Sequence, residues 1–257
     1  MTTYELASGY SMPALGLGTW QLRGKTCTEA VRTALDLGYD HIDTADAYSN
    51  HRAIAQALRG YNPTELFITS KIPPSDLHHD DVVAVGNRAL SELEVDYLDL
   101  LLIHWPNPEI PVAETLSAMA ELVEQGKVRS IGVSNFMIED LKEALEVTEV
   151  PIAVNQVKYH PYHNQQALLD YCKEHNIVVT AYSPFGNGSL IGDATLNRIA
   201  AKYDKNMPQV VLNWLVRKGM VVIPKSKNPD HIEANMDIFD WELEEEDFEA
   251  IDSLDRS

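Results

Sequence analysis

The sequence predicts an α/β protein folded as a single (β/α)8 (TIM) barrel, on the strength of two observations. Short apolar runs alternate with helical patterns along the whole chain, and buried strands of parallel sheets read as such runs. Eight strand–helix units fit within the 257 residues, and eight units close a barrel of ~250 residues. A doubly wound open sheet is the alternative architecture.

Each expected strand is a short run rich in apolar and β-branched residues, as buried strands require. The runs are 14–20 (ALGLGTW), 39–44 (YDHIDT), 66–71 (LFITSK), 97–104 (YLDLLLIH), 128–133 (VRSIGV), 152–157 (IAVNQV), 177–182 (IVVTAY) and 220–224 (MVVIP). The segment before Ala14 is left unassigned, although it could cover the bottom of the barrel.

The expected helices lie between and after these strands, at 26–37, 51–58, 80–93, 111–125, 138–147, 165–175, 195–203, 208–217, 230–236 and 244–254. Thr26 is a candidate N-cap of the first helix. Gly38 follows the last residue of that helix, where a left-handed glycine commonly ends a helix. No Gly/Ser-rich or Pro-rich linker divides the chain, so we expect residues 1–257 to form one domain.

The charge balance argues against polyanionic partners. There are 39 acidic and 20 basic residues, a net charge of −19, and such a surface repels nucleic acid and anionic membranes. Two interpretations stay open: an acidic cytosolic protein, or one adapted to high salt, where screening removes the repulsion among carboxylates. We expect a monomer that binds neither nucleic acid nor membrane.

The sequence favours a cytoplasmic location. Cys27 and Cys172 belong to no ligand-like cluster, which favours a reducing compartment and argues against zinc or a disulfide framework. The first residues lack the basic and apolar regions of a signal peptide, and no apolar run approaches the ~18 residues of a membrane span.

Polar residues that end apolar strands are the candidate functional groups, because barrel active sites lie at the carboxyl ends of the strands. These positions hold Asp43, Lys71, His104, Ser134, Asn135, Gln156, Tyr182 and Lys225. Taken singly, each has an ordinary structural explanation, such as helix capping, a surface ion pair or core packing. Several at successive strand ends favour a shared site.

Four residues at this rim suggest proton delivery to an oxygen atom. Neighbouring strands lie ~4.8 Å apart, so Asp43, Lys71 and His104 can converge with Tyr48, which follows the second strand. A lysine held charged by a carboxylate favours phenolate and lowers the pKa of a nearby tyrosine. Tyr48 could then donate a proton near neutral pH, while His104 donates a hydrogen bond to the substrate oxygen.

An ordered series of motifs resembles the aldo-keto reductase family, in the short form of prokaryotic aldehyde reductases and 2,5-diketo-D-gluconate reductases. The series covers almost the whole chain: 16–20 (GLGTW), 43–45 (DTA) followed by Tyr48, 69–71 (TSK), 102–106 (LIHWP), 131–136 (IGVSNF), 155–156 (NQ), 181–184 (AYSP) and 223–226 (IPKS). No GxGxxG dinucleotide fingerprint occurs, and this family does not use one.

The resemblance implies an NAD(P)H-dependent reductase of aldehydes and ketones, an alcohol:NADP+ oxidoreductase on a (β/α)8 barrel. Tyr48 would be the general acid, Lys71 its partner paired with Asp43, and His104 the residue that orients the carbonyl. No metal is implied. In the oxidative direction Tyr48 would act as the base.

The resemblance also implies a cofactor site along the rim. Tyr182 would stack on the nicotinamide, and the loop at 183–190 would strap the pyrophosphate. The full expected set is Gly18, Thr19, Trp20, Asp43, Ser134, Asn135, Gln156, Tyr182, Ser183, Pro184, Gly186, Leu190, Lys225, Ser226, Lys227, Asn228, His231 and Asn235.

Two departures from the family pattern bear on cofactor choice. Family members usually carry Arg where this chain has His231, and Glu where it has Ala234. An arginine is charged at every relevant pH, whereas histidine is mostly neutral near pH 7. Because Lys225 and Lys227 remain, we expect NADP(H) to be preferred, with NAD(H) also possible.

The expected substrate residues are Trp20, Tyr48, His104 and Trp105. Core packing is the alternative explanation for the two tryptophans. The sequence stops at Ser257, soon after the last expected helix, where longer relatives cover the substrate with a further loop, so we expect an open pocket.

Two other functions compete with this interpretation. One is a non-catalytic, nucleotide-binding regulatory barrel of the same family, which would bind cofactor without turnover. The other is a metal-dependent isomerase barrel, which needs clustered carboxylates and histidines at strand ends, and only Asp43 and His104 qualify.

Overall fold

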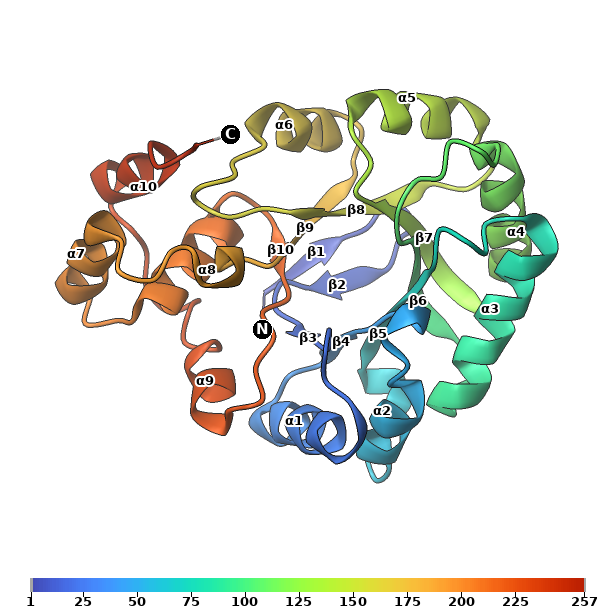
Figure 1. Cartoon of the computed structure of the whole chain (residues 1–257), viewed down its shortest axis with the longest axis horizontal. Coiled ribbons are helices and arrows are strands. Elements are labelled where there is room, and N and C mark those ends of the chain that lie inside the picture. The colour runs from blue at the N-terminus through green and yellow to red at the C-terminus, as the bar shows by residue number, and fades with distance from the viewer. Residues whose placement is uncertain (1, 257) are drawn as a thin grey trace.

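A computed structural model describes residues 2–256, and its centre is a sheet of eight parallel strands in sequential order (Figure 1). The strands are β3 (Leu17–Gly18), β4 (His41–Asp43), β5 (Phe67–Ile72), β6 (Leu98–Ile103), β7 (Val128–Ser134), β8 (Ile152–Lys158), β9 (Val178–Tyr182) and β10 (Val221–Val222). Each strand pairs with the next one along the chain. The predicted eight-stranded parallel architecture is therefore confirmed.

A parallel bridge between Leu15 and Val222 joins the two edges of the sheet. The backbone N–H of Gly16 donates to the Val222 carbonyl at 2.9 Å, and that of Val222 donates to the Ala14 carbonyl at 2.8 Å. At this seam the strands are shorter than predicted: β3 covers two residues of the expected 14–20, and β10 two of the expected 220–224. The seam is held mainly by single bridging hydrogen bonds.

Helices surround the sheet (Figure 1). They are α1 (Gly24–Leu37), α2 (His51–Leu58), α3 (His79–Leu93), α4 (Val112–Glu124), α5 (Ile138–Val147), α6 (Gln166–Glu174), α7 (Ala194–Lys202), α8 (Met207–Arg217), α9 (Pro229–Ala234) and α10 (Glu245–Asp252). The bounds of α2 and α5 are as predicted, and Gly38 ends α1 with a φ of 101°. Thr26 is not an N-cap, because α1 begins at Gly24 and Arg23 occupies the cap position.

The segment that the sequence left unassigned is a hairpin of β1 (Thr3–Glu5) and β2 (Ser11–Pro13). Leu6 and Met12 of this hairpin segment are buried in one cluster with Phe67, Leu100 and Val154 from the barrel strands. Phe67 begins β5, so the hairpin closes the end of the barrel opposite the strand carboxyl ends. The other end stays available for a site.

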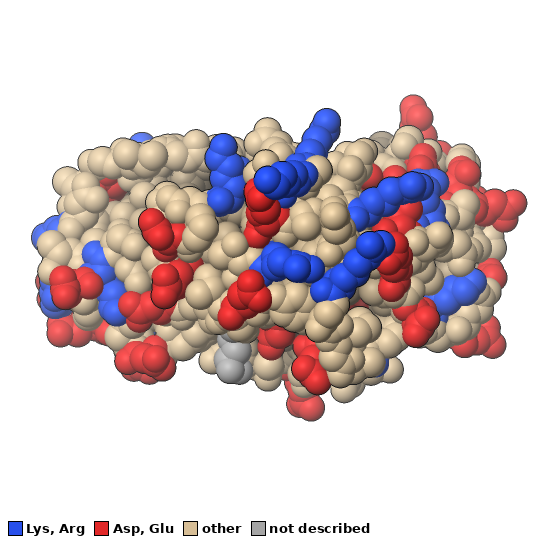
Figure 2. All heavy atoms as spheres, turned by 90° about the horizontal axis from the view of Figure 1, so that it is seen from below, with Lys and Arg blue, Asp and Glu red and all other residues tan. Residues whose placement is uncertain are grey.

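Acidic and basic side chains mix on the face formed by α1 and α2, where Lys and Arg gather near the middle (Figure 2). Arg59 pairs with Glu94 at 3.1 Å and Arg88 with Asp46 at 2.9 Å. Such exposed pairs contribute little each, but they limit the repulsion that a net charge of −19 produces. Among the helices described, none is long and apolar enough to cross a membrane.

We expect Gly132→Ala to lower the free energy of unfolding by about 3 kcal/mol, because its new methyl carbon would lie 2.5 Å from the Val154 carbonyl oxygen. Gly86→Ala on α3 is the matched control, since its methyl would meet the flexible Leu122 side chain at 2.7 Å. That side chain can move and alanine favours a helix, so a change within about 1 kcal/mol is expected. Urea unfolding compares the two, and equal losses would contradict this description of the core.

Candidate active site

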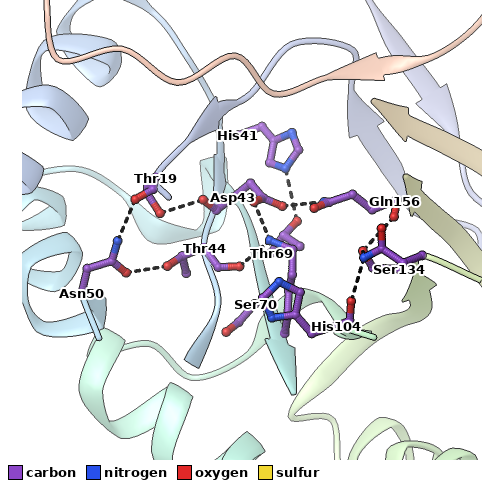
Figure 3. Close-up of polar contacts among 12 residues, drawn as sticks. Thr19, His41, Asp43, Thr44, Asn50, Thr69, Ser70, His104, Ser134 and Gln156 are labelled. Carbon is purple, nitrogen blue, oxygen red and sulfur yellow. Dashed lines mark hydrogen bonds and ion pairs between the residues drawn. The ribbon is translucent and has the colours of Figure 1, made fainter. Parts of the chain in front are cut away.

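The carboxyl ends of three neighbouring strands bring the predicted catalytic residues together. Asp43 ends β4, Lys71 lies near the end of β5, and His104 follows β6. Tyr48 ends the short 3-10 turn, Asp46–Tyr48, that leaves β4. Asp43 lies at the centre of a group of polar contacts (Figure 3).

The group contains a buried ion pair between Lys71 and Asp43. The Lys71 ammonium lies 2.6 Å from Asp43 Oδ1 and also donates to the Thr44 carbonyl at 2.7 Å. Both side chains are buried. Gln156 Nε2 donates to the other oxygen, Asp43 Oδ2, at 2.8 Å. Burial is the largest single effect and lowers the pKa of Lys71, but Asp43 and Tyr48 together outweigh it and the net direction is upward, so Lys71 stays charged.

The half-buried Tyr48 ring lies close to both Lys71 and His104. The Lys71 ammonium is 5.2 Å from the ring centroid. The His104 ring packs edge-on against it, with centroids 5.7 Å apart. Burial raises the pKa of Tyr48 and the Lys71 charge lowers it, with burial the larger effect. The expected net lowering is therefore wrong for the cofactor-free protein, although Lys71 acts in the expected direction.

His104 is neutral in this environment. Burial, together with the nearby Lys71 charge, lowers its pKa to about 4. Its backbone N–H donates to the Ile72 carbonyl at 3.0 Å, and its own carbonyl accepts from Asn135 Nδ2 at 3.0 Å. A neutral imidazole has one N–H to donate, so His104 can give a hydrogen bond to an oxygen next to the Tyr48 hydroxyl.

One residue that the sequence analysis did not single out, Asn50, contributes to the hydrogen bonds that hold the backbone around the ion pair. Asn50 accepts a hydrogen bond from the Thr44 hydroxyl at 2.6 Å and donates to the Thr19 carbonyl at 3.1 Å. The Thr19 hydroxyl donates to the Asp43 carbonyl at 2.8 Å. These buried contacts fix the backbone on both sides of the ion pair. The only sequence signal was a polar residue shortly after Tyr48.

The residues expected to hold the nicotinamide end form one connected network. The Tyr182 hydroxyl donates to Asn135 Oδ1 at 2.9 Å, and Asn135 Nδ2 donates to Ser134 Oγ at 3.0 Å. The Ser134 hydroxyl donates to the Gln156 carbonyl at 2.7 Å, and the Gln156 side chain reaches Asp43. The network thus links the half-exposed Tyr182 ring to the catalytic ion pair.

The loop expected to bind pyrophosphate (residues 183–190, here called the strap loop) contains four residues with positive φ: Ser183, Gly186, Asn187 and Gly188. The backbone of 186–188 forms a short 3-10 turn. Asn187, Gly188 and Ser189 are exposed, whereas the Leu190 side chain is fully buried in the core. Leu190, which the sequence analysis expected to contact the cofactor, can therefore offer only its backbone.

The residues expected at the adenosine end fall into two groups. Lys225, Lys227 and His231 are exposed, and neither lysine forms an ion pair with any carboxylate of residues 2–256. Ser226 and Asn228 instead bond to the turn that begins α9, and Asn235 is buried. Gly18 has a structural reason to be glycine, since a Cβ there would lie 2.5 Å from the Ile223 carbonyl oxygen.

The two candidate substrate tryptophans lie at the surface. Trp20 and Trp105 are each 48% exposed, so the core-packing alternative is wrong for both. Trp20 follows β3 and Trp105 follows His104 after β6, so both lie at the same end of the barrel as Tyr48. Among the residues that the structure covers, no group of His, Cys, Asp or Glu side chains is arranged to hold a metal ion.

A parallel eight-stranded barrel with an Asp–Lys–Tyr–His group at its carboxyl rim agrees with what comparison with known proteins finds. The model of the Aldo/keto reductase family matches residues 14–256. The chain therefore belongs to the aldo/keto reductase family, as the motifs predicted.

Individual relatives are similar over nearly their full length. The chain is 41% identical to the glyoxal reductase of Bacillus subtilis, over 99% of this chain and 93% of that protein. It is 40% identical to the 9,11-endoperoxide prostaglandin H2 reductase of Trypanosoma cruzi, over 97% of this chain and 90% of that one. These relatives are named as reductases, which supports an oxidoreductase activity for the family member described here.

Solved structures agree with this placement. An aldo-keto reductase from a Medee basin deep-sea metagenome library superimposes with a TM-score of 0.96 at 38% identity, covering 99% of this chain and 95% of that one. The aldo-keto reductase of Bombyx mori, solved in complex with NADP, gives a TM-score of 0.93 at 32% identity, covering 99% and 93%.

We expect Lys71→Met to lower the free energy of unfolding by about 3–5 kcal/mol, because it leaves the buried Asp43 carboxylate without its cation. The double variant Asp43→Asn/Lys71→Met removes both charges and should recover most of that loss. Urea unfolding of the wild type, the single variant and the double variant measures the difference. A single variant that loses less than about 1 kcal/mol would contradict a buried, charged pair.

Proposed function

We propose that this protein reduces aldehydes and ketones to alcohols with NADP(H), and that Tyr48 is the proton donor. The observation that carries the proposal is the position of the Tyr48 ring, whose centroid lies 5.2 Å from the Lys71 ammonium and 5.7 Å from the centroid of the His104 ring. No other tyrosine of the described chain has both a buried lysine and a half-buried neutral histidine beside it.

The catalytic step follows from the charges around Tyr48. NADP(H), when bound, supplies the hydride. The neutral His104 ring donates a hydrogen bond to the carbonyl oxygen and so orients it, while the Tyr48 hydroxyl gives that oxygen its proton. The Tyr48 phenolate that remains is stabilised by the Lys71 ammonium, which Asp43 keeps charged and in place. In the oxidative direction the phenolate accepts the proton.

The residues at the rim fit NADP(H) on chemical grounds. Tyr182 offers an aromatic face that its hydroxyl contact with Asn135 holds in one orientation. The glycines of the strap loop allow a phosphate to approach the backbone closely. Lys225 and Lys227 are exposed cations without an ion-pair partner among the described residues, so they are free to bind a 2′-phosphate.

The proposed cofactor preference follows from those lysines. They favour NADP(H), but this chain has His231 where family members usually carry an arginine, whose guanidinium is charged at every relevant pH, so NAD(H) should also be used, with lower efficiency. The exposed Trp20 and Trp105 are proposed as aromatic walls of an open pocket that accepts a range of carbonyl compounds. We further propose a cytoplasmic, monomeric enzyme.

We expect Tyr48→Phe to lower kcat at least ~100-fold, because general acid catalysis contributes that much or more, while the Kd for NADPH changes less than about twofold. The measurement is reduction of a panel of aldehydes, ketones and sugars with NADPH and with NADH, together with NADPH binding by fluorescence titration. Tyr10→Phe, at an exposed tyrosine of the hairpin segment, is the matched control and should keep full activity.

Three outcomes of that assay would count against the proposal. Substantial turnover by Tyr48→Phe would exclude Tyr48 as the donor. Cofactor binding without turnover of any carbonyl by the wild type would indicate a regulatory barrel. Equal or better efficiency with NADH would show that His231 matters more than the two lysines.

A further inference from the structure

The last residue of α10 and those after it (residues 252–256, here called the tail segment) lie against the loop between β8 and α6 (residues 159–165, here called the β8–α6 loop). Asp252 fixes the start of the tail segment, since its Oδ1 accepts from Trp214 Nε1 at 3.0 Å and from Lys218 Nζ at 2.7 Å. The backbone N–H of Asn164 donates to Asp255 Oδ1 at 2.9 Å. The Arg256 guanidinium lies 3.5 Å from the Tyr162 ring centroid. The tail segment thus holds the β8–α6 loop at two places.

The β8–α6 loop in turn contacts Asp193, which lies three residues past the end of the strap loop. His160 and His163 form an antiparallel bridge, so the chain turns tightly and Tyr162 lies at the tip. The Tyr162 hydroxyl donates to Asp193 Oδ2 at 2.5 Å. Asp193 also caps α7 by accepting from the Leu196 N–H at 2.9 Å. Tyr162 therefore fixes Asp193, the N-cap residue of α7, which follows the strap loop.

The same loop also supports the middle of the strap loop. The His160 side chain is 4% exposed, and a methyl group on Gly186 would lie 3.2 Å from its Cε1 and 3.3 Å from its Nε2. Neither ring nitrogen of His160 has a hydrogen-bond partner. A buried imidazole without partners is costly, and from its position next to Gly186 the ring can offer the strap loop one hydrogen-bond donor and one acceptor.

The strap loop needs such support because of its backbone. Ser183 and Asn187 have φ values of 49° and 55°, in the left-handed region that costs a residue other than glycine free energy. The backbone hydrogen bonds within the loop are short-range turns, from Gly186 N–H to Ser183, from Gly188 N–H to Phe185 and from Ser189 N–H to Gly186. Without outside contacts, a loop with these features would sample other conformations.

We infer that Tyr162, His160 and Arg256 are positioning residues that brace the strap loop, so that the tail segment controls how long NADP(H) stays bound. The inference rests on the proposed function for its effect on the cofactor, but the brace itself does not require a cofactor. Tyr162 contacts both Arg256 of the tail segment and Asp193, and so links the two. The His160 ring packs next to Gly186. None of the three touches the reacting atoms.

The test uses Tyr162→Phe, which removes the hydroxyl contact with Asp193 but keeps the ring under Arg256, and Arg256→Ala, which removes the stacking cation. Amide hydrogen exchange of residues 184–193 is measured in the cofactor-free protein. We expect exchange there to be three- to tenfold faster in both variants, as the loss of one charge-assisted hydrogen bond or one cation–π contact implies. Tyr61→Phe, which removes a tyrosine–Asp36 contact between α1 and the end of α2, is the matched control and should leave this exchange unchanged.

NADPH dissociation, followed by stopped-flow fluorescence, is the second measurement on the same proteins. We expect a three- to tenfold faster release and a raised KM for NADPH in both variants, with an unchanged KM for the carbonyl substrate. Unchanged exchange of residues 184–193 in both variants would overturn the brace. Faster exchange with an unchanged NADPH release rate would overturn the control of cofactor residence. A wild-type protein that binds no nucleotide would instead refute the proposed function while the exchange data still decide the brace.

Discussion

The structure of the site depends on one interaction, the buried ion pair between Lys71 and Asp43. Its Nζ–Oδ1 distance is 2.6 Å, and the lysine has no exposed surface. Placing two charges in such an environment is expensive unless every remaining donor and acceptor is used. Here the Thr44 carbonyl accepts a second hydrogen bond from the Lys71 ammonium, and Gln156 donates a hydrogen bond to the second Asp43 oxygen. The result is a fixed positive charge beside the Tyr48 ring.

The barrel makes this arrangement possible because it aligns strand ends that are far apart in sequence. Asp43 on β4 and Gln156 on β8 are 113 residues apart, and they meet across the rim at 2.8 Å. The hairpin of β1 and β2 closes the opposite end, where Leu6 and Met12 are buried. The network from Tyr182 through Asn135 and Ser134 then joins the proposed nicotinamide face to the same ion pair. A substitution at one end of this hydrogen-bond network should therefore alter the structure at the other end.

The sequence predicted the architecture and the meeting of Asp43, Lys71 and His104, because in a parallel barrel the strand carboxyl ends share one rim. It could not predict which partners complete each hydrogen bond. Gln156 was expected to face the cofactor, yet its amide lies on Asp43, and the support from Asn50 depends on a loop conformation that no periodicity reports. The direction of the Tyr48 pKa was also beyond reach, since it depends on how burial compares with the Lys71 charge. The sequence also did not predict how short β3 and β10 are at the closing seam, where single bridges replace a ladder of hydrogen bonds.

The most direct test of the central claim is the titration of Tyr48 itself, followed by NMR of tyrosine labelled with 13C at Cζ and assigned with Tyr48→Phe. Burial should place the pKa of Tyr48 above the ordinary tyrosine value of ~10, so the phenol stays protonated through neutral pH and loses its proton only at higher pH. In Lys71→Met the pKa should rise further, because the charge that favours the phenolate is gone. A Tyr48 pKa that is unchanged or lower in Lys71→Met would contradict the account.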